Sequence, residues 1–454
     1  MMVVTRYKPK RIMPKLFRNL IVSGFAAFCI CLTGFSAFAQ DGSYDQYTAL
    51  PRYSTPGDSW KNYLNHLLVY PFELVRWPLN QSLVATEKYH LDKKAKWVYD
   101  QVVDQGITPR ASVLSIGSFG AGFDLDWIRL ARQKENLPDF QTKSWLHWHN
   151  DVTFEVGSKI GMERIAETGA KVGGLFKYEK RPEDHFYGIG PNTSKGDGTS
   201  YKNETTTLET SAGYSLTPDM SVDFKFAWQN INITEGEDDG RGQIDPIFFP
   251  QTIPGLDGDD LVTLGAEWNH DTRNFKTNST RGGEERLAFS YNEGVGNSDA
   301  RYFKFVAELS RYISLWSKRR VLAFHVYGEH NNEMDNHEVP FHQMARLGGY
   351  GSYPRISKTL RSYDNNRFFD ENAALFNIEY RYTIWEYREF KVDTVLFFDE
   401  GQVFGEFSEF QLEDFRESYG LGWRLSLANH VLFSFEIAHG DEGTEFHVKS
   451  ATPF

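Results

Sequence analysis

Polar and apolar residues alternate along most of the chain after residue 110. In residues 222–229, Val, Phe, Phe and Trp occupy every second position, and Asp, Lys, Ala and Gln lie between them. The same alternation recurs in residues 262–269, 374–383 and 431–437. Successive side chains of a β-strand point to opposite faces of the sheet. Each segment is therefore predicted to be a strand with one apolar face and one polar face.

Turn signals separate sixteen segments of this kind, most of them about 10–14 residues long, a length that suits tilted strands crossing a membrane. A strand of a β-sandwich also alternates, but its apolar face needs a second sheet to cover it. The sequence thus predicts an all-β fold, a sixteen-stranded antiparallel transmembrane β-barrel at residues 109–454. The predicted strands are 110–119, 121–132, 144–157, 158–167, 170–184, 201–214, 218–232, 259–271, 283–293, 301–314, 320–330, 371–384, 389–404, 413–428, 430–440 and 445–454.

An even number of strands places both ends of the barrel on the periplasmic side. Connections that follow odd-numbered strands are then extracellular, which is where outer-membrane barrels carry their long loops. The two longest connections, 233–258 and 331–370, follow the seventh and eleventh predicted strands. Both are therefore expected outside the cell.

The first 39 residues have the pattern of a secretory signal peptide. Six basic residues and no acidic ones precede an apolar stretch from Leu20 to Leu32, and Ala37-Phe38-Ala39 gives a small-x-small cleavage site. The alternative is an uncleaved membrane anchor, which the short apolar stretch disfavours. A signal peptide and a β-barrel together predict the outer membrane of a Gram-negative cell.

Cleavage changes the composition of the mature chain. It removes the only two cysteines, Cys29 and Cys31, which excludes catalytic thiols, cysteine zinc sites and disulfides. It also leaves 43 Lys and Arg against 61 Asp and Glu, a net charge of −18. Such an acidic chain is not expected to bind nucleic acid. Its 15% aromatic content suits rings that face lipid or fill a soluble β core.

Residues 40–108 lack this alternation, and their apolar residues are spaced differently. Trp60, Leu64 and Leu67 recur at helical spacing, as do Leu91 and Ala95, and no pair of alternating strands is visible. We predict a short helical periplasmic segment. It could cap the barrel, lie on the membrane surface or plug the lumen.

Signatures of chemistry are sparse. His147, His149 and Asp151 share one face of a predicted strand, which fits a metal or hydrolase site but fits polar residues of a lumen better. The acidic run 235–241 could bind divalent cations near lipopolysaccharide, although it lacks the spacing of a calcium loop. We expect no enzyme activity, no cofactor and no metal site.

The chain ends in Phe454, with Phe446 and Val448 in the same phase. A terminal aromatic residue on the closing strand resembles the sorting signal of outer-membrane barrels. Phe454 is therefore expected at the end of the last predicted strand, 445–454.

Residues 346–404 carry more specific motifs. These are a Gly-Gly pair at Gly348 and Gly349, a Leu-Arg-x-Tyr tetrad at 360–363, an acid at Glu379 and a Phe-x-Asp-x-Gly-x-Val run at 397–403. In this order they resemble the BamA/TamA-like outer-membrane superfamily, also known as the bacterial surface antigen family. Two further segments, 186–190 and 268–273, look like earlier strands of that family.

The resemblance implies a structural loop lock. In that family the tetrad lies at the tip of a long extracellular loop that folds back into the lumen, so Arg361 is expected to meet the inward acids Glu379 and Asp399. Tyr363, Gly348 and Gly349 would shape the same tip. Ser362 stands where the family has glycine.

The resemblance also implies a function. Members that assemble or translocate proteins carry periplasmic POTRA domains, and residues 41–108 are too short for more than one and lack its strands. We expect a barrel that aids insertion or export of protein or lipid, with client proteins, outer-membrane lipids and lipopolysaccharide as partners. The alternatives are a porin-like channel with a charged lumen and an outer-membrane lipid hydrolase.

Overall fold

The computed structural model describes residues 106–115, 118–127, 140–149, 153–162, 164–165, 168–238, 240–244, 248, 253–335, 337–350, 358–387, 390–427, 430–449 and 452–454. The predicted signal peptide, Asp151 and the predicted helical segment up to residue 105 lie outside these residues. In the part that is described, no helix is long and apolar enough to cross a bilayer.

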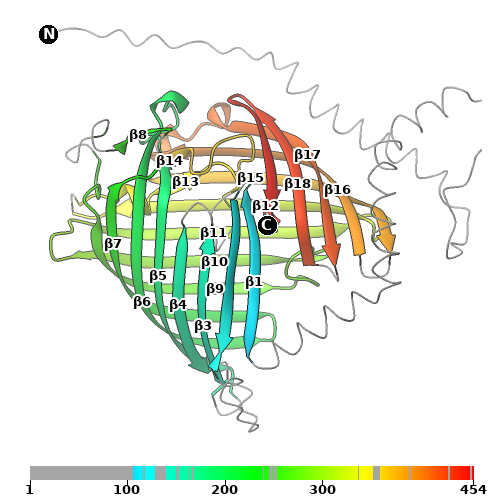
Figure 1. Ribbon diagram of the computed structural model, residues 1–454, viewed down its shortest axis with the longest axis horizontal. Helices are drawn as coiled ribbons and strands as arrows, with labels where there is room; N and C mark the ends of the chain where they lie inside the picture. Colours follow the sequence, from blue (N-terminus) through cyan, green and yellow to red (C-terminus); the bar gives the residue numbers. More distant parts are fainter. Residues whose placement is uncertain are drawn as a thin grey trace, which may run out of the picture. The chain divides into compact units, whose positions relative to one another are not determined.

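Sixteen long strands follow one another in chain order, and each pairs antiparallel with the next. Figure 1 shows this progression from cyan β1 to the red C-terminal strands. The strands are β1 (Ile107–Ser115), β2 (Ser118–Asp126), β3 (Phe140–His149), β4 (Phe154–Met162), β5 (Ala170–Phe186), β6 (Thr199–Thr217), β7 (Met220–Glu235), β9 (Asp259–Asp271), β10 (Gly282–Val295), β11 (Arg301–Ser314), β12 (Arg320–Glu333), β15 (Asn372–Tyr387), β16 (Phe390–Phe404), β17 (Arg416–Leu427), β18 (His430–Gly440) and β19 (Gly443–Lys449).

The connections contain only short elements. Strand β8 (Gly242–Gln243) runs parallel to the start of β6, and β13 (Ala345–Leu347) pairs with β14 (Phe368–Asp370) in a separate two-stranded sheet. Four single-turn 3₁₀ helices complete the described elements, namely η1 (Lys195–Asp197), η2 (Phe341–Gln343), η3 (Phe407–Glu409) and η4 (Leu412–Asp414).

The apolar face of the strands is the outer one. Phe224 on β7, Leu264 on β9 and Leu287 on β10 expose 58%, 59% and 54% of their surface. Rings and aliphatic chains exposed to this extent on successive strands would be unfavourable in water, and they belong against lipid. The prediction of a sixteen-stranded antiparallel β-barrel in the outer membrane is confirmed.

The two long connections both follow odd-numbered strands, as predicted. Residues 236–258 follow β7, the seventh long strand, and residues 334–371 follow β12, the eleventh. Both therefore leave the barrel at the same rim, which is the extracellular one because long loops are extracellular in outer-membrane barrels. The opposite rim is periplasmic.

The predicted boundaries of the third and fourth strands are wrong. The predicted break fell after residue 157, whereas β3 ends at His149 and β4 begins at Phe154. The turn between them is tight, with the backbone N–H of His149 donating to the Thr153 carbonyl at 2.9 Å. A hairpin this short lets the alternation continue in phase, so the pattern alone did not reveal it.

The predicted position of Phe454 is also wrong. Strand β19 ends at Lys449, and Phe446 faces outward with 52% of its surface exposed. The ring of Phe454 instead stacks on His325, with 5.0 Å between centroids and 15° between planes. His325 is fully buried and belongs to the inward-facing set of β12. The last residue therefore lies inside the barrel, because the chain leaves the sheet after Lys449.

Candidate functional site

The connection after β12 turns back into the barrel. Strands β13 and β14 pair Ala345 with Asp370, so they bring both ends of the intervening segment together. Leu360 and Tyr363 of that segment are buried against the inner faces of β15 and β16. The ring of Tyr363 lies 5.2 Å from that of Phe368. Residues 358–367, which we call the loop tip, are thus held within the lumen.

Two glycines make the turn into the loop tip possible. Gly348 has φ +133° and Gly349 has φ +62°, conformations that side chains with a Cβ rarely adopt. A Cβ on Gly348 would lie 2.4 Å from the Asp364 carbonyl oxygen, and one on Gly349 would lie 2.8 Å from Asn365 Cα. The backbone of the loop therefore folds against itself at this pair.

Arg361 lies at the centre of a buried ion network. Its Nε and Nη2 atoms donate to both oxygens of Asp399 at 2.8 and 2.6 Å, and its Nη1 donates to Glu379 Oε1 at 2.7 Å. The guanidinium also lies 3.5 Å from the centroid of the Phe397 ring. Arg361, Glu379 and Asp399 are all fully buried. The planar fork of arginine suits such a site because it serves two carboxylates and stays charged away from water.

Two further members of this network lie outside the motifs recognised in the sequence. Glu436 on β18 accepts from Arg361 Nη1 at 3.1 Å, and Arg424 on β17 binds Glu379 at 2.7 Å and Glu436 at 2.6 Å. Both residues are fully buried and point inward. The signal was a lone charge between outward-facing apolar residues in each strand.

The charges of the network balance. Arg381 joins it by donating to Glu379 at 2.8 Å, so three arginines face three carboxylates, Glu379, Asp399 and Glu436. A buried charge is tolerated only when it is paired and hydrogen-bonded. Removal of any one member would leave an uncompensated charge in the interior.

The backbone of the loop tip is also held by hydrogen bonds to the barrel strands. Asn377 on β15 donates to the Thr359 carbonyl at 2.8 Å, and the Ser362 N–H donates to Ser418 Oγ on β17 at 2.8 Å. His447 Nε2 on β19 lies 2.6 Å from the Arg361 carbonyl oxygen. Ser362 has no positive φ, so the backbone at this position does not require glycine. The tip is tied to strands up to the last one.

A second group of contacts ties the loop tip to other extracellular connections. Arg367 donates to the Thr193 carbonyl at 2.7 Å and to Glu442, in the β18–β19 turn, at 2.8 Å. Asp364 accepts from Tyr187 at 2.8 Å and pairs with Lys195 at 3.0 Å. Although burial opposes it, these two hydrogen bonds lower the pKa of Asp364.

A third contact lies on the inner face of β12. Lys358 of the loop tip donates to Glu329 at 2.6 Å, and Lys304 of β11 donates to the other oxygen of the same carboxylate at 2.8 Å. Glu329 is 4% exposed. Each oxygen of this buried acid therefore faces an ammonium group.

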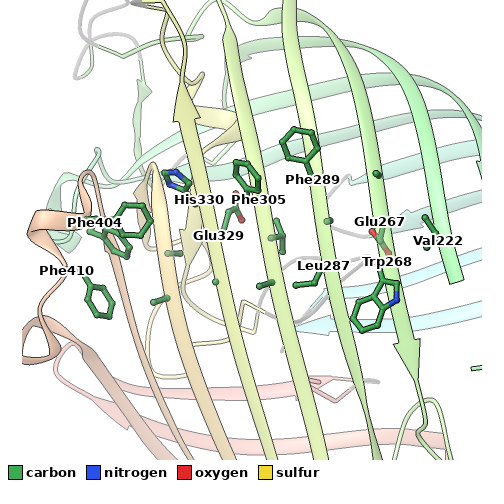
Figure 2. Close-up of a pocket in the computed structure, with 18 of the residues that line it drawn as sticks. Val222, Glu267, Trp268, Leu287, Phe289, Phe305, Glu329, His330, Phe404 and Phe410 are labelled. Carbon is green, nitrogen blue, oxygen red and sulfur yellow. The ribbon is translucent and has the colours of Figure 1, made fainter. Parts of the chain in front are cut away.

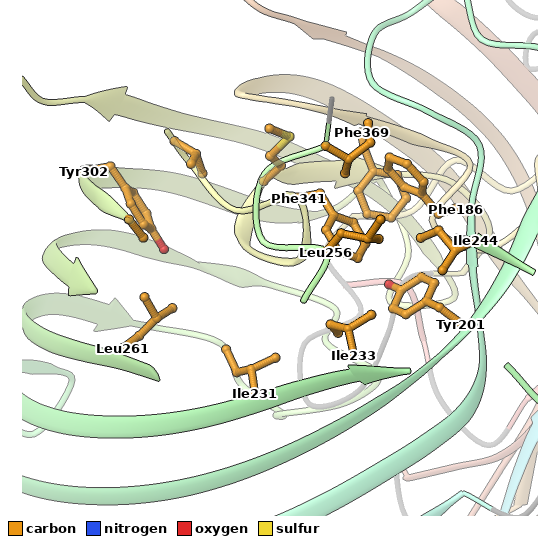
Figure 3. Packing of buried hydrophobic residues seen from close by; sticks show 14 residues of the cluster. Phe186, Tyr201, Ile231, Ile233, Ile244, Leu256, Leu261, Tyr302, Phe341 and Phe369 are labelled. Carbon is orange, nitrogen blue, oxygen red and sulfur yellow. The ribbon is translucent and has the colours of Figure 1, made fainter. Parts of the chain in front are cut away.

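Apolar side chains close the extracellular end beside the loop tip. Phe186 at the end of β5 meets Phe341 and Phe369 of the long connection, with centroids 4.9 and 5.1 Å apart. Ile244 and Leu256, from the connection after β7, join the same cluster (Figure 3). Two connections and the end of β5 thus share one apolar core across the mouth of the barrel.

The periplasmic end is narrowed by the connection between β9 and β10. Asn278 donates to Asp393 on β16 at 2.8 Å and to Ser426 on β17 at 3.3 Å. Asn278 and its neighbour Ser279 are buried. Together with Phe454, this turn covers the lower part of the inner wall formed by β12, β15, β16 and β17.

Of the histidine cluster predicted on β3, His147 and His149 lie within the described residues. His147 Nε2 lies 3.0 Å from Asp124 and its Nδ1 lies 3.8 Å from Glu155, so it pairs with inward acids of the neighbouring strands. Among the described residues, no group of three or more His, Cys, Asp or Glu is arranged to hold a metal ion.

Residues 148–449 match the family profile described as the Omp85 superfamily domain. The chain belongs to the Omp85 superfamily. The match covers well over half of the chain and confirms the resemblance seen at residues 346–404. No curated protein matches the sequence.

Two solved structures share the fold of this Omp85 barrel. BamA from Haemophilus ducreyi lacking POTRA domains 1–3 is 16% identical, with a TM-score of 0.52 over 76% of this chain and 68% of that one. CdiB from Escherichia coli is 11% identical, with a TM-score of 0.50 over 76% of this chain and 63% of that one. The Omp85 barrel therefore spans less than two thirds of the CdiB chain.

Proposed function

We propose that this Omp85 barrel is a non-enzymatic outer-membrane protein that aids the insertion or export of protein or lipid clients. The observation that carries the proposal is the Arg361 network. It fixes a folded-back loop to β15, β16, β17 and β18, and His447 extends the attachment to β19, the last strand. The loop tip is thereby placed to hold the end of the sheet in position.

The seam between the first and last strands supports a lateral route. Strand β19 forms seven residue pairs with β18. Only the ladder between β2 and β3 is equally short, and all other successive long strands form longer ladders. Strands β1 and β19 lie side by side, but among the described residues no ladder joins them. Strand edges without a partner present N–H and C=O groups to which another strand can add. A client strand would pair there, with protein clients, outer-membrane lipids and lipopolysaccharide as the proposed partners.

A reversible cross-link across the seam tests this proposal. Phe446→Cys would be combined with single cysteines along β1, since the predicted mature chain contains none. In the native host, oxidation should reproduce the change in outer-membrane protein and lipid composition caused by depletion, and reduction should reverse it. The control is Ile437→Cys with Phe446→Cys, which links two strands already in register. Normal composition after either depletion or seam cross-linking would refute the proposal.

The porin-like alternative makes a different prediction for purified protein in planar bilayers. The inward residues Asn377, Glu379 and Arg424 are fully buried, so this part of the lumen admits no water. We expect little steady conductance from the wild type and more from Arg361→Ala. A large conductance that is unchanged by Arg361→Ala would favour the channel.

A further inference from the structure

A row of small residues crosses the outer face of the barrel wall. Ala307 on β11 pairs with Gly328 on β12, and Gly328 pairs with Ala374 on β15. Leu287 on β10 and Gln402 on β16 end the row. Since neighbouring strands lie about 4.8 Å apart, these five positions span about 19 Å. The three central positions leave a depression in a surface otherwise built from large side chains.

Larger residues bound the row on both sides. Toward the extracellular rim, the next row contains Phe289, Phe305 and His330, with the rings of Phe305 and His330 stacked 6.0 Å apart. Toward the periplasm, Leu309 and Val326 form the next row. The result is a groove of about 770 Å³ on the outer face, and Figure 2 shows Phe289, Phe305 and His330 among the residues that line it.

The segment after β16 folds over one end of the groove. Phe407 of η3 packs on His330 with 4.8 Å between ring centroids, and Phe410 packs on Phe404 at 5.3 Å. The N–H of Gln411 donates to Gln402, the polar end of the row. The groove therefore ends under an aromatic cover that belongs to an extracellular connection.

Gly328 is not explained by the fold. A Cβ built on it meets nothing within 4 Å, its φ is not positive, and the register of β12 is continuous with both neighbours. Glycine in a strand interior weakens the strand, and the usual reasons are a bulge, a bend or the close approach of a ligand. The continuous register excludes a bulge at Gly328, and the open space beside its Cα would admit the close approach of another group, such as a ligand.

We propose that this groove binds an acyl chain of a membrane lipid, lying across Ala307, Gly328 and Ala374 beneath Phe407. The groove faces outward on a barrel of the outer membrane, so acyl chains are the medium around it. Barrel strands tilt by about 45°, so a 19 Å row projects about 13 Å onto the membrane normal, close to the roughly 15 Å of one leaflet. Its volume lies within the range of about 300–1,000 Å³ typical of small-ligand sites.

Photolabelling tests the site directly. Full-length protein would be reconstituted in phosphatidylethanolamine vesicles that carry a trace of the same lipid with a diazirine in its acyl chain. Peptides that contain Phe305, Gly328 or Phe407 should be labelled roughly tenfold more than other outward-facing peptides, by analogy with the discrimination of apolar pockets. Uniform labelling would overturn the proposal, because it would mean that only bulk lipid touches this face.

Variants that fill the groove provide the second arm. Gly328→Leu and Ala307→Phe place bulk in open space on the outer face, and they should abolish the excess labelling while the barrel still folds. Ala121→Phe is the matched control, because Ala121 also faces outward, on β2 beside Trp148, and neither residue lines the groove. Excess labelling that survives both filling variants would refute the site. So would cross-linking in native membranes that captures a protein at Phe407 instead of lipid.

Discussion

His447, on the last strand, lies with Nε2 2.6 Å from the carbonyl oxygen of Arg361 at the loop tip. The residue that anchors the loop and the strand that borders the seam are therefore joined directly. His447→Ala should leave this buried carbonyl without a donor and lower the free energy of unfolding by about 1–3 kcal/mol. Urea unfolding in vesicles measures this. His447→Gln, which keeps a donor, should retain part of the stability, and equal stability of His447→Ala and wild type would contradict the role.

Arg424 offers a test of the charge balance. Arg424→Ala should destabilise the barrel by about 3–5 kcal/mol, because it leaves Glu379 and Glu436 with too few positive partners. The double variant Arg424→Met with Glu436→Gln should lose less than the sum of the two single changes, which a double-mutant cycle measures. Additive losses would mean that the two side chains act independently.

Substitution by alanine should destabilise the barrel at Gly348 and Gly349 but not at Gly328. Gly348→Ala and Gly349→Ala place a Cβ against the backbone of the loop tip in conformations that favour glycine, so each should cost about 1–3 kcal/mol. Gly328→Ala meets open space and should be neutral or slightly stabilising. Thermal unfolding of the three variants side by side decides between these expectations.

Two carboxylates at the extracellular rim should make the long connection sensitive to pH. Burial and the neighbouring Glu333, Asp370, Glu406 and Glu409 raise the pKa of Glu371 to about 7. Burial also raises the pKa of Asp370 to about 6. The folded state therefore binds these protons more tightly than the unfolded state does, and local stability rises as the pH falls from about 8 to about 5.

Hydrogen exchange of residues 368–371 measures this effect. Protection should increase as the pH falls, once the intrinsic exchange rates are corrected for. Glu371→Gln should show a smaller dependence on pH, because only Asp370 then still titrates in this range. Protection that grows with rising pH in the wild type would contradict the assignment.

The strand pattern was predictable because the two faces of this sheet meet different surroundings. In β9 and β10 every second side chain lies against lipid, so alternation persists along the whole strand. The boundary between β3 and β4 was not predictable, because the turn at 150–153 does not interrupt the phase. Phe454 was misplaced because its contact with His325 joins residues 129 positions apart in the chain.

The candidate site was predictable only in part. Arg361, Glu379 and Asp399 could be grouped because their motifs resemble a known family, and the structure brings them together. Arg424 and Glu436 complete the network from β17 and β18. Each is an isolated charge between apolar residues of an alternating strand, and many strands carry such a charge. Which inward charges meet depends on the register and shear of the barrel. The alternation of polar and apolar residues carries no information about either.

The chain occupies its own lumen from both sides, with the loop tip entering from outside and Phe454 and Asn278 from the periplasm. Because the lumen is filled from both sides, its closure does not depend on the edges of β1 and β19. The proposed client route at those edges and the barrier across the lumen are then separate properties of one wall. Selection can loosen the seam without opening a hole.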